Sequence, residues 1–275
     1  MLDYWRRIER LNETENKINE EGNNLEQRVI DKTVEVNKLL REKARFIDNL
    51  SHDLATPLTP IISLLPMVKE KLSDEKLLEI IDTCIRSAEY IKRVVNNARE
   101  IAEIGAADML LKKENMFEIV DELIKKYDVV FKSSNIKIEN IISQDVFVKT
   151  ERNRFLQLFD HITSNAVNSM LEGSGTLTYD SKAIDKEGGA FIQISVTDTG
   201  VGLIREQIDH LFDEFYKTDD SRNKLDSTGL GLSICKRIVE KHGGKIWADS
   251  HGEGTGTTIY LTIPSSEVVF TRSFL

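Results

Sequence analysis

The chain of 275 residues carries 46 acidic and 37 basic side chains, which gives a formal net charge of −9. This excess of acid argues against a nucleic-acid binder, because such proteins usually present a basic face to the phosphates. The length accommodates about two domains, and a hydrophobic content of 40% suits a globular protein. No apolar run approaches the roughly 20 residues that span a bilayer, and no signal peptide opens the chain. We therefore expect a cytoplasmic chain, although a membrane anchor or sensor domain of a longer parent could precede it.

Residues 1–42 are polar, with sparse apolar positions such as Val29, Val36 and Leu39. This spacing predicts a weak parallel coiled coil that leads, as a signalling helix, into the next segment. A disordered or frayed start is an equally open interpretation for residues 1–24.

The segment around His52 has apolar residues at helical spacing, among them Phe46, Leu50 and Leu54. It places an imidazole beside the carboxylate of Asp53. Pro57 cannot donate a backbone hydrogen bond and disfavours helical angles at the residue before it, so we expect a bend here. Taken alone, His52 is most often a surface residue on a kinked helix, and the rest of the chain must decide.

A second amphipathic helix follows Ser73, which could cap it, and its apolar stripe runs from Leu77 to Ala102. Together the two helices predict a helical hairpin over residues 43–105. A hairpin leaves its apolar stripe half uncovered, so we expect a homodimer that buries it as a four-helix bundle. The two cysteines, Cys84 and Cys235, form no metal-like cluster and suggest a reducing compartment.

The pattern changes after Gly105, and residues 109–266 mix strands and helices without strict alternation, before a tail at 267–275. We expect an α+β sandwich with helices on one face of a sheet. The predicted helices are 117–131, 151–171 and 232–241, and the predicted strands are 136–141, 146–148, 175–179, 190–196, 245–248 and 257–263.

Three polar or glycine-rich sets stand out in this second region. Asp198 follows a strand and precedes Gly200 and Gly202, which suits a hydrogen bond to an exocyclic amine such as that of adenine. Gly229 and Gly231 open a helix, where backbone N–H groups favour phosphate. Taken alone, each of these two sets is more simply explained as an ordinary turn. A third glycine set, 252–257, could be a hairpin turn.

His161, Asn165 and Asn168 occur at positions i, i+4 and i+7 of a predicted helix and share one face. Asn165 lies next to Ala166 on the expected buried side and would need a partner there. Its carbonyl oxygen is a suitable hard ligand for a magnesium ion that bridges phosphates. An asparagine bonded to a neighbouring loop is about equally plausible.

In this order, the segments resemble the catalytic region of two-component sensor histidine kinases. His52–Leu58 is similar to the H box of that family, Asn153–Ala166 to its N box and Asp198–Gly202 to its G1 box. Leu211–Phe215 is similar to the F box and Gly229–Leu232 to the G2 box. The resemblance covers about residues 40–264. It implies a dimerisation and histidine-phosphotransfer hairpin, followed by a Bergerat-type ATP-binding α/β sandwich of the gyrase, chaperone, histidine kinase and MutL type.

The resemblance also implies an activity: transfer of the γ-phosphoryl group of Mg²⁺-ATP to His52, and from there to an aspartate of a response-regulator receiver domain. Asp53 would orient and activate His52. Thr56 would position a water molecule for dephosphorylation of the regulator. Asn165 would bind Mg²⁺. The implied ATP-binding residues are Asn165, Asn168, His161, Asp198, Gly200, Gly202, Lys217, Arg222, Gly229, Leu230, Gly231, Leu232 and Thr257, with Lys217, Arg222 and Lys224 in an ATP lid at 216–228.

Three positions depart from the family pattern. His161 replaces the first asparagine of the N box, Asn168 replaces a common lysine, and Ala55 replaces the usual H-box arginine. These changes put the catalytic rate in doubt rather than the fold. The alternative function is a weak or degenerate kinase that serves as an ATP-binding regulator scaffold or phosphatase. A gyrase- or chaperone-like ATPase would leave the H box unexplained.

Overall fold

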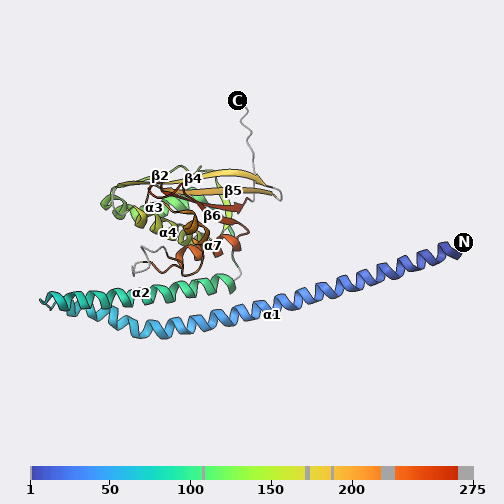
Figure 1. Cartoon of the computed structure of the whole chain (residues 1–275), viewed down its shortest axis with the longest axis horizontal. Helices are drawn as coiled ribbons and strands as arrows, with labels where there is room; N and C mark the ends of the chain where they lie inside the picture. The colour runs from blue at the N-terminus through green and yellow to red at the C-terminus, as the bar shows by residue number, and fades with distance from the viewer. Residues whose placement is uncertain (1, 107–108, 171–173, 187–188, 218–226, 266–275) are drawn as a thin grey trace, which may run out of the picture.

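The computed structural model describes residues 2–106, 109–170, 174–186, 189–217 and 227–265. Two helices begin the chain, α1 (Leu2–Lys69) and α2 (Glu75–Ala106). They run side by side as a hairpin, with the start of α1 projecting far beyond it (Figure 1). Because α1 is helical from Leu2, the alternative of a disordered start is wrong. It also runs unbroken through residues 42 and 43, so the division between signalling helix and hairpin stays a prediction.

One local expectation about the hairpin needs correction. Asp74, not Ser73, caps α2, because its Oδ1 accepts the backbone N–H groups of Lys76 and Leu77 at 2.9 and 3.2 Å. Helix α1 also continues through Pro57 and the two prolines that follow it. The missing donor of Pro57 leaves the carbonyl of Asp53 without its usual helical partner. Asp53 is exposed, so water can bind this carbonyl and the helix need not break.

The second region is an α/β sandwich, as predicted. Its five-stranded sheet has the order β2-β4-β5-β7-β6, in which only β2 and β4 pair in parallel. The helices α3, α4 and α7 cover one face of the sheet, on the side of the hairpin (Figure 1). The strands are β2 (Ile136–Asn140), β4 (Gly175–Lys186), β5 (Gly189–Asp198), β6 (Lys245–Asp249) and β7 (Thr257–Pro264), and the helices are α3 (Met116–Ser133), α4 (Arg152–Ser169) and α7 (Gly231–Lys241).

Three features were not predicted. Strand β1 (Lys112–Asn115) pairs antiparallel with β3 (Phe147–Thr150) as a separate two-stranded sheet. Helix α5 (Arg205–His210) follows the Asp198 loop. Strand β4 extends to Lys186, beyond the predicted end at residue 179, because its second half pairs with β5 as a long hairpin. The predicted tail at 267–275 lies outside the described residues. None of the helices within the described ranges combines the length and apolar character that a membrane crossing requires.

The core between helices and sheet fixes the orientation of α4. Phe155, Leu158 and Phe159 on this helix are fully buried, and Phe159 packs edge-on against Tyr179 of β4. The Tyr179 hydroxyl also makes a buried hydrogen bond of 2.6 Å with Thr163 of α4. This bond pairs two hydroxyls that would otherwise be costly to bury. The opposite face of α4, which carries the candidate asparagines, is thereby held toward solvent.

A buried histidine gives the sandwich a pH-dependent stability. His242, at the end of α7, donates through Nδ1 to the carbonyl of Ile238 (2.7 Å), so its Nε2 accepts from the Thr150 hydroxyl (3.0 Å). Burial lowers the pKa of His242 below its ordinary value of 6.5. The unfolded chain therefore binds the extra proton first, and stability falls as the pH drops below this value.

We predict that the calorimetric unfolding midpoint of the chain falls between about pH 7.5 and about pH 5.5, where an ordinary histidine titrates. In His242→Gln the fall should be smaller, because the variant has no group to protonate. His251→Gln, at an exposed position of the same domain, is the matched control and should retain the parental pH dependence. An equal fall in the parent and in His242→Gln would assign it to other groups.

Candidate functional site

His52 lies on the open surface of α1. Its side chain is 85% exposed, and its Nδ1 stands 3.6 Å from Oδ1 of Asp53, which is also exposed. This distance is slightly longer than a hydrogen bond, so a small side-chain rotation would bring the carboxylate onto the ring N–H. Nε2 then remains free as a nucleophile. The chemistry available at this position is attack by a neutral imidazole on an electrophile that arrives from solvent or from another domain.

Thr56, one turn after His52, is exposed, and its hydroxyl donates to the His52 backbone carbonyl at 2.9 Å. The hydroxyl proton is thus engaged within the helix. The oxygen lone pairs still face solvent and can accept a hydrogen bond from water.

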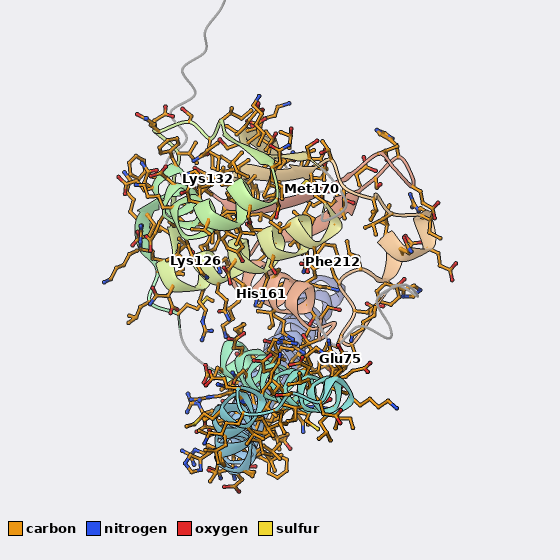
Figure 2. The ribbon with its side chains drawn as sticks, turned by 90° about the vertical axis from the view of Figure 1, so that its left-hand side faces the viewer. Glu75, Lys126, Lys132, His161, Met170 and Phe212 are labelled. Carbon is orange, nitrogen blue, oxygen red and sulfur yellow. The ribbon has the colours of Figure 1, made fainter. Side chains whose placement is uncertain are left out.

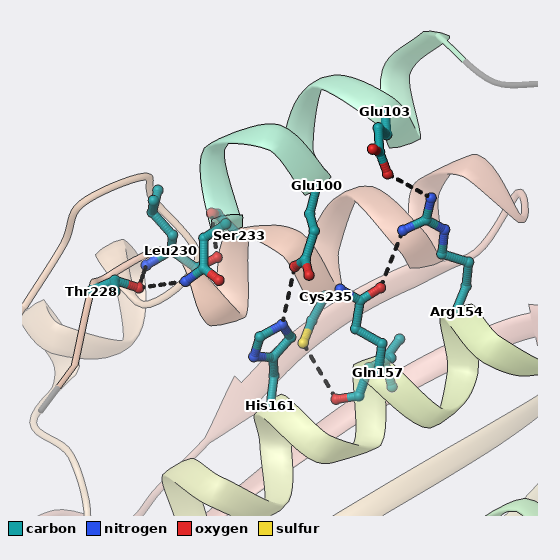
Figure 3. Close-up of polar contacts among 11 residues, drawn as sticks. Glu100, Glu103, Arg154, Gln157, His161, Thr228, Leu230, Ser233 and Cys235 are labelled. Atoms are coloured by element: carbon teal, nitrogen blue, oxygen red, sulfur yellow. Dashed lines mark hydrogen bonds and ion pairs between the residues drawn. The ribbon is translucent and has the colours of Figure 1, made fainter. Parts of the chain in front are cut away.

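Ion pairs between the two helices fix the level of His52 along the hairpin. Asp48, one turn before His52, pairs with Arg99 of α2 at 2.9 Å. Nearer the turn, Lys69 pairs with Asp82 at 2.7 Å. Since the helices are antiparallel, His52 lies at nearly the level of residues 95–97 of α2. This is the part of α2 that approaches the sandwich, where the Asn97 amide donates to the hydroxyl of Thr228 at 2.7 Å (Figure 3).

Asp198 ends strand β5 and is 8% exposed. Its Oδ1 accepts from the Gly200 backbone (2.8 Å), the Thr257 backbone (3.3 Å) and the Ser169 hydroxyl (3.3 Å). Burial raises the pKa of this carboxyl, and the three donors oppose that rise. Within the part of the chain that the structure describes, no donor is directed at Oδ2. The carboxylate is therefore held rigidly by one oxygen and offers the other to an outside donor such as an exocyclic amine.

The fold itself requires glycine at two positions near Asp198, Gly202 and Gly229. Gly202 has a φ of +71°, and an added Cβ would lie 2.1 Å from the backbone oxygen of Gly252. Gly229 has a φ of +70°, and an added Cβ would lie 2.8 Å from the backbone of Phe215. Both positions require glycine for conformation and packing. The loops that frame Asp198 therefore depend on these glycines even before any nucleotide approaches.

The three polar residues of α4 separate into two groups. Asn165 and Asn168 are exposed, so the expectation that Asn165 lies on the buried side is wrong. Neither side chain makes a hydrogen bond to the described residues. His161 is half-buried on the side of the sandwich that faces the hairpin (Figure 2). An exposed amide oxygen fits Mg²⁺, which prefers hard oxygen ligands and retains water and phosphate in its remaining positions. No cluster of three or more acidic, histidine or cysteine ligands occurs among the described residues.

The remaining predicted ATP-binding residues that the structure describes lie in different settings. Lys217 lies over the Tyr90 ring of α2, with Nζ 5.0 Å from the ring centre. Leu230 is buried below the glycine turn, and Gly231 begins α7. Leu232 packs against the core, and Thr257 bonds to Asp198 through its backbone. Arg222 and Lys224 lie outside the described residues, as does most of the predicted lid.

Sequence reasoning missed two contributors. Ser169 holds Asp198 by a hydrogen bond, and its Oγ occupies the space beside Gly200, where a Cβ would come within 2.1 Å. Thr228 connects α2 to the G2 turn, because its hydroxyl also accepts the backbone N–H of Leu230 (3.3 Å). Small hydroxyl residues in loops carry no distinctive sequence signal. Only a view of their partners reveals these roles.

Two family models match the chain. Residues 42–107 match the His Kinase A (phospho-acceptor) domain, and residues 150–267 match the histidine kinase-, DNA gyrase B- and HSP90-like ATPase. Together they span most of the chain and correspond to the hairpin and the sandwich. The fold and the site thus define a phospho-acceptor domain followed by an ATPase domain.

Curated relatives are similar to this chain over most of its length. The sensor histidine kinase WalK of Bacillus subtilis is 32% identical over 244 residues, which cover 87% of this chain and 39% of the relative. The sensor protein kinase WalK of Staphylococcus aureus is 31% identical over 243 residues, covering 86% and 57%. The chain belongs to the sensor histidine kinases of two-component systems and comprises their catalytic region. It spans 39% and 57% of the length of these two relatives, which is less than two thirds of each.

Solved structures support the fold. Full-length ShkA in complex with AMPPNP has a TM-score of 0.64 at 22% identity, covering 81% of this chain and 46% of that chain. Histidine kinase ThkA in complex with response regulator protein TrrA gives a TM-score of 0.57 at 22% identity, covering 82% and 64%. Acinetobacter baumannii histidine kinase AdeS gives 0.55 at 19% identity, covering 78% and 98%.

Proposed function

We propose that this chain binds Mg²⁺-ATP in the sandwich and transfers the γ-phosphoryl group to His52. One observation carries the proposal. Asn97 bonds to Thr228 beside the Gly229 turn, at nearly the level of His52 along the hairpin. The glycine turn that is proposed to hold phosphate therefore lies at nearly the same position along the hairpin axis as His52, the proposed phosphoryl acceptor.

In the proposed step, Nε2 of neutral His52 attacks the γ-phosphorus, the bond between this phosphorus and the β–γ bridging oxygen breaks, and ADP leaves. The ring proton stays on Nδ1, where the Asp53 carboxylate can accept a hydrogen bond from it and stabilise the positive charge that develops on the ring. Asp53 is 79% exposed, and its proposed contribution to the rate is the orientation of the ring.

For the nucleotide, we propose that Oδ2 of Asp198 accepts the adenine amine. A guanine would present a carbonyl oxygen to this carboxylate and be repelled. Gly229, Gly231 and the start of α7 would supply backbone N–H groups to phosphate. Asn165 would supply an oxygen to Mg²⁺, which neutralises phosphate charge when bound. Because ATP is the phosphoryl donor, we place this activity in the cytoplasm.

Exposed apolar residues on the hairpin support a homodimer. Leu50 and Leu54, on either side of His52, are each 43% exposed, and Phe46 is 63% exposed. On α2, Leu77, Ile80 and Ile91 are also more than 40% exposed. Large apolar side chains left exposed on both helices are unfavourable in water. A second copy would bury it as a four-helix bundle.

We propose that phosphorylated His52 then donates its phosphoryl group to a receiver-domain aspartate of a response regulator, and that Thr56 assists the later hydrolysis of this aspartyl phosphate by water. The exposed surface next to His52 leaves room for such a partner. The free lone pairs of Thr56 suit the orientation of a water molecule for attack on an aspartyl phosphate. The second candidate, a weakly active regulator scaffold, rests on the loss of an asparagine at position 161 and a lysine at 168.

Incubation with Mg²⁺ and γ-labelled ATP tests the proposal. A phosphohistidine is expected, recognised by protein-bound label that acid removes and alkali does not. Addition of a receiver domain should move the label from this chain to the regulator. If ATP binds but no acid-labile label forms, the scaffold function is correct instead.

A further inference from the structure

Helix α2 contacts the sandwich through a row of polar side chains spaced three residues apart: Asn97, Glu100 and Glu103. Asn97 donates to Thr228, Glu100 faces His161 of α4, and Glu103 pairs with Arg154 of α4 at 3.6 Å (Figure 3). These three contacts join the hairpin to the helix that carries the candidate N box and to the turn that carries the G2 glycines.

The middle contact differs from its neighbours because it is incomplete. Nε2 of His161 and Oε2 of Glu100 are 3.9 Å apart. Both atoms are inaccessible to solvent, and neither has a hydrogen-bond partner. A buried donor or acceptor without a partner costs about 1–3 kcal/mol, and more when it is charged. Two such atoms face each other across a domain boundary, so a reversible event such as proton binding could turn this contact into a hydrogen bond.

A proton completes it. When the neutral ring carries its hydrogen on Nδ1, Nε2 is an acceptor and faces another acceptor, the carboxylate. When the hydrogen is on Nε2, this atom is a donor but carries no charge. Protonation makes Nε2 a charged donor in either case, and a shift of about 1 Å would bring the pair from 3.9 Å to the usual length of an ionic hydrogen bond. We propose that His161 and Glu100 form a proton-dependent latch that holds the ATP-binding sandwich on α2.

The surroundings leave Glu100 as the dominant partner of the ring. On α2, Glu103 is already shared between Arg99 (2.9 Å) and Arg154, and Arg93 lies two turns before Glu100. On α4, Asp160 is paired with Lys126 at 2.6 Å. Helix α7 presents Gly231 to Nδ1, close enough that an added Cβ would lie 3.2 Å away. Among the described residues, no other carboxylate lies within 4 Å of the His161 ring nitrogens.

Thermodynamic linkage sets the direction and size of the effect. If the docked form binds one more proton than the undocked form, acidification favours docking by up to about tenfold per pH unit. An asparagine at position 161, as in the family pattern, has no proton to gain.

Interdomain distance tests the latch without reference to catalysis. In the nucleotide-free chain, spin labels at exposed Cys84 of α2 and at Lys182→Cys on β4 report the separation of the two parts, while buried Cys235 stays unlabelled. An excess of unlabelled chain restricts the signal to one labelled protomer per dimer. The population at the docked distance should rise several-fold between about pH 8 and about pH 6, the range in which an ordinary histidine titrates.

Glu100→Gln and His161→Asn should each remove this pH dependence. His210→Asn, which changes an exposed histidine that pairs with Asp213 and not with Glu100, should retain it. The latch is contradicted if the docked population of the parent chain does not change with pH. It is also contradicted if the docked population of Glu100→Gln keeps the parental pH dependence. Glu100 lies outside the sandwich core, so its variant decides the question even if His161→Asn fails to fold.

Discussion

Replacement of His52 by glutamine is expected to abolish acid-labile labelling from γ-labelled ATP, with a loss of at least about 100-fold, because no other group supplies the nucleophile. The His52 side chain is 85% exposed and makes no core contact, so the fold should be unaffected. ATP affinity, measured by calorimetric titration, should stay within about twofold of the parent, since the proposed nucleotide site lies on another domain.

His251→Gln provides the matched control, because His251 is also exposed but lies on the sandwich. It should label at the parental rate. Equal labelling of His52→Gln and the parent would show that another residue accepts the phosphoryl group and that the proposed role of the H box is wrong. A loss of ATP affinity in His52→Gln would instead show that the substitution acts on the sandwich.

Asp198→Asn is expected to weaken ATP binding by roughly 10- to 100-fold, the usual cost of leaving a buried donor or acceptor mispaired. Asparagine keeps one oxygen, which can accept the backbone N–H groups of Gly200 and Thr257 as Oδ1 does now. Its amide nitrogen then replaces Oδ2 and presents a donor to the donor of adenine. Isothermal titration with ATP measures the effect, and labelling at low ATP should fall in parallel.

Asp249→Asn removes an equal charge at an exposed position of β6 and controls for general electrostatics. Its affinity for ATP should match the parent. If Asp198→Asn also binds ATP as the parent does, adenine is recognised by other groups and the assignment of Asp198 is wrong. Circular dichroism establishes that each variant remains folded.

The parts of the fold that could be predicted are those with strong periodicity. The hairpin follows from the three/four spacing of α2, and strands β5 and β7 follow from apolar alternation. Strand β1 has the sequence Lys-Lys-Glu-Asn, which contains no apolar residue and becomes a strand only through its pairing with β3. The cap of α2 was misassigned because Ser73 and Asp74 are both good caps, and one residue of register decides between them.

The candidate site also has a part that the sequence predicts and a part that it does not. Its residue types, such as Asp198 at a strand end, are visible in local sequence. Its long-range partners are not. Nothing near Glu100 in the sequence indicates that it meets His161, and the exposure of Asn165 depends on how the Tyr179–Thr163 bond turns α4 on the sheet. Contacts between distant segments follow from tertiary packing, which overrides the local pattern.

The central claim is that the γ-phosphoryl group of ATP is transferred to His52, and site-resolved mass spectrometry of the chain after incubation with Mg²⁺-ATP tests it most directly. Digestion at neutral to alkaline pH preserves a phosphorylated imidazole. We expect a phosphoryl group on the peptide that contains His52, and a strongly reduced amount on that peptide in Asp198→Asn at low ATP. A phosphoryl group on any other residue, with the His52 peptide unmodified, would contradict it.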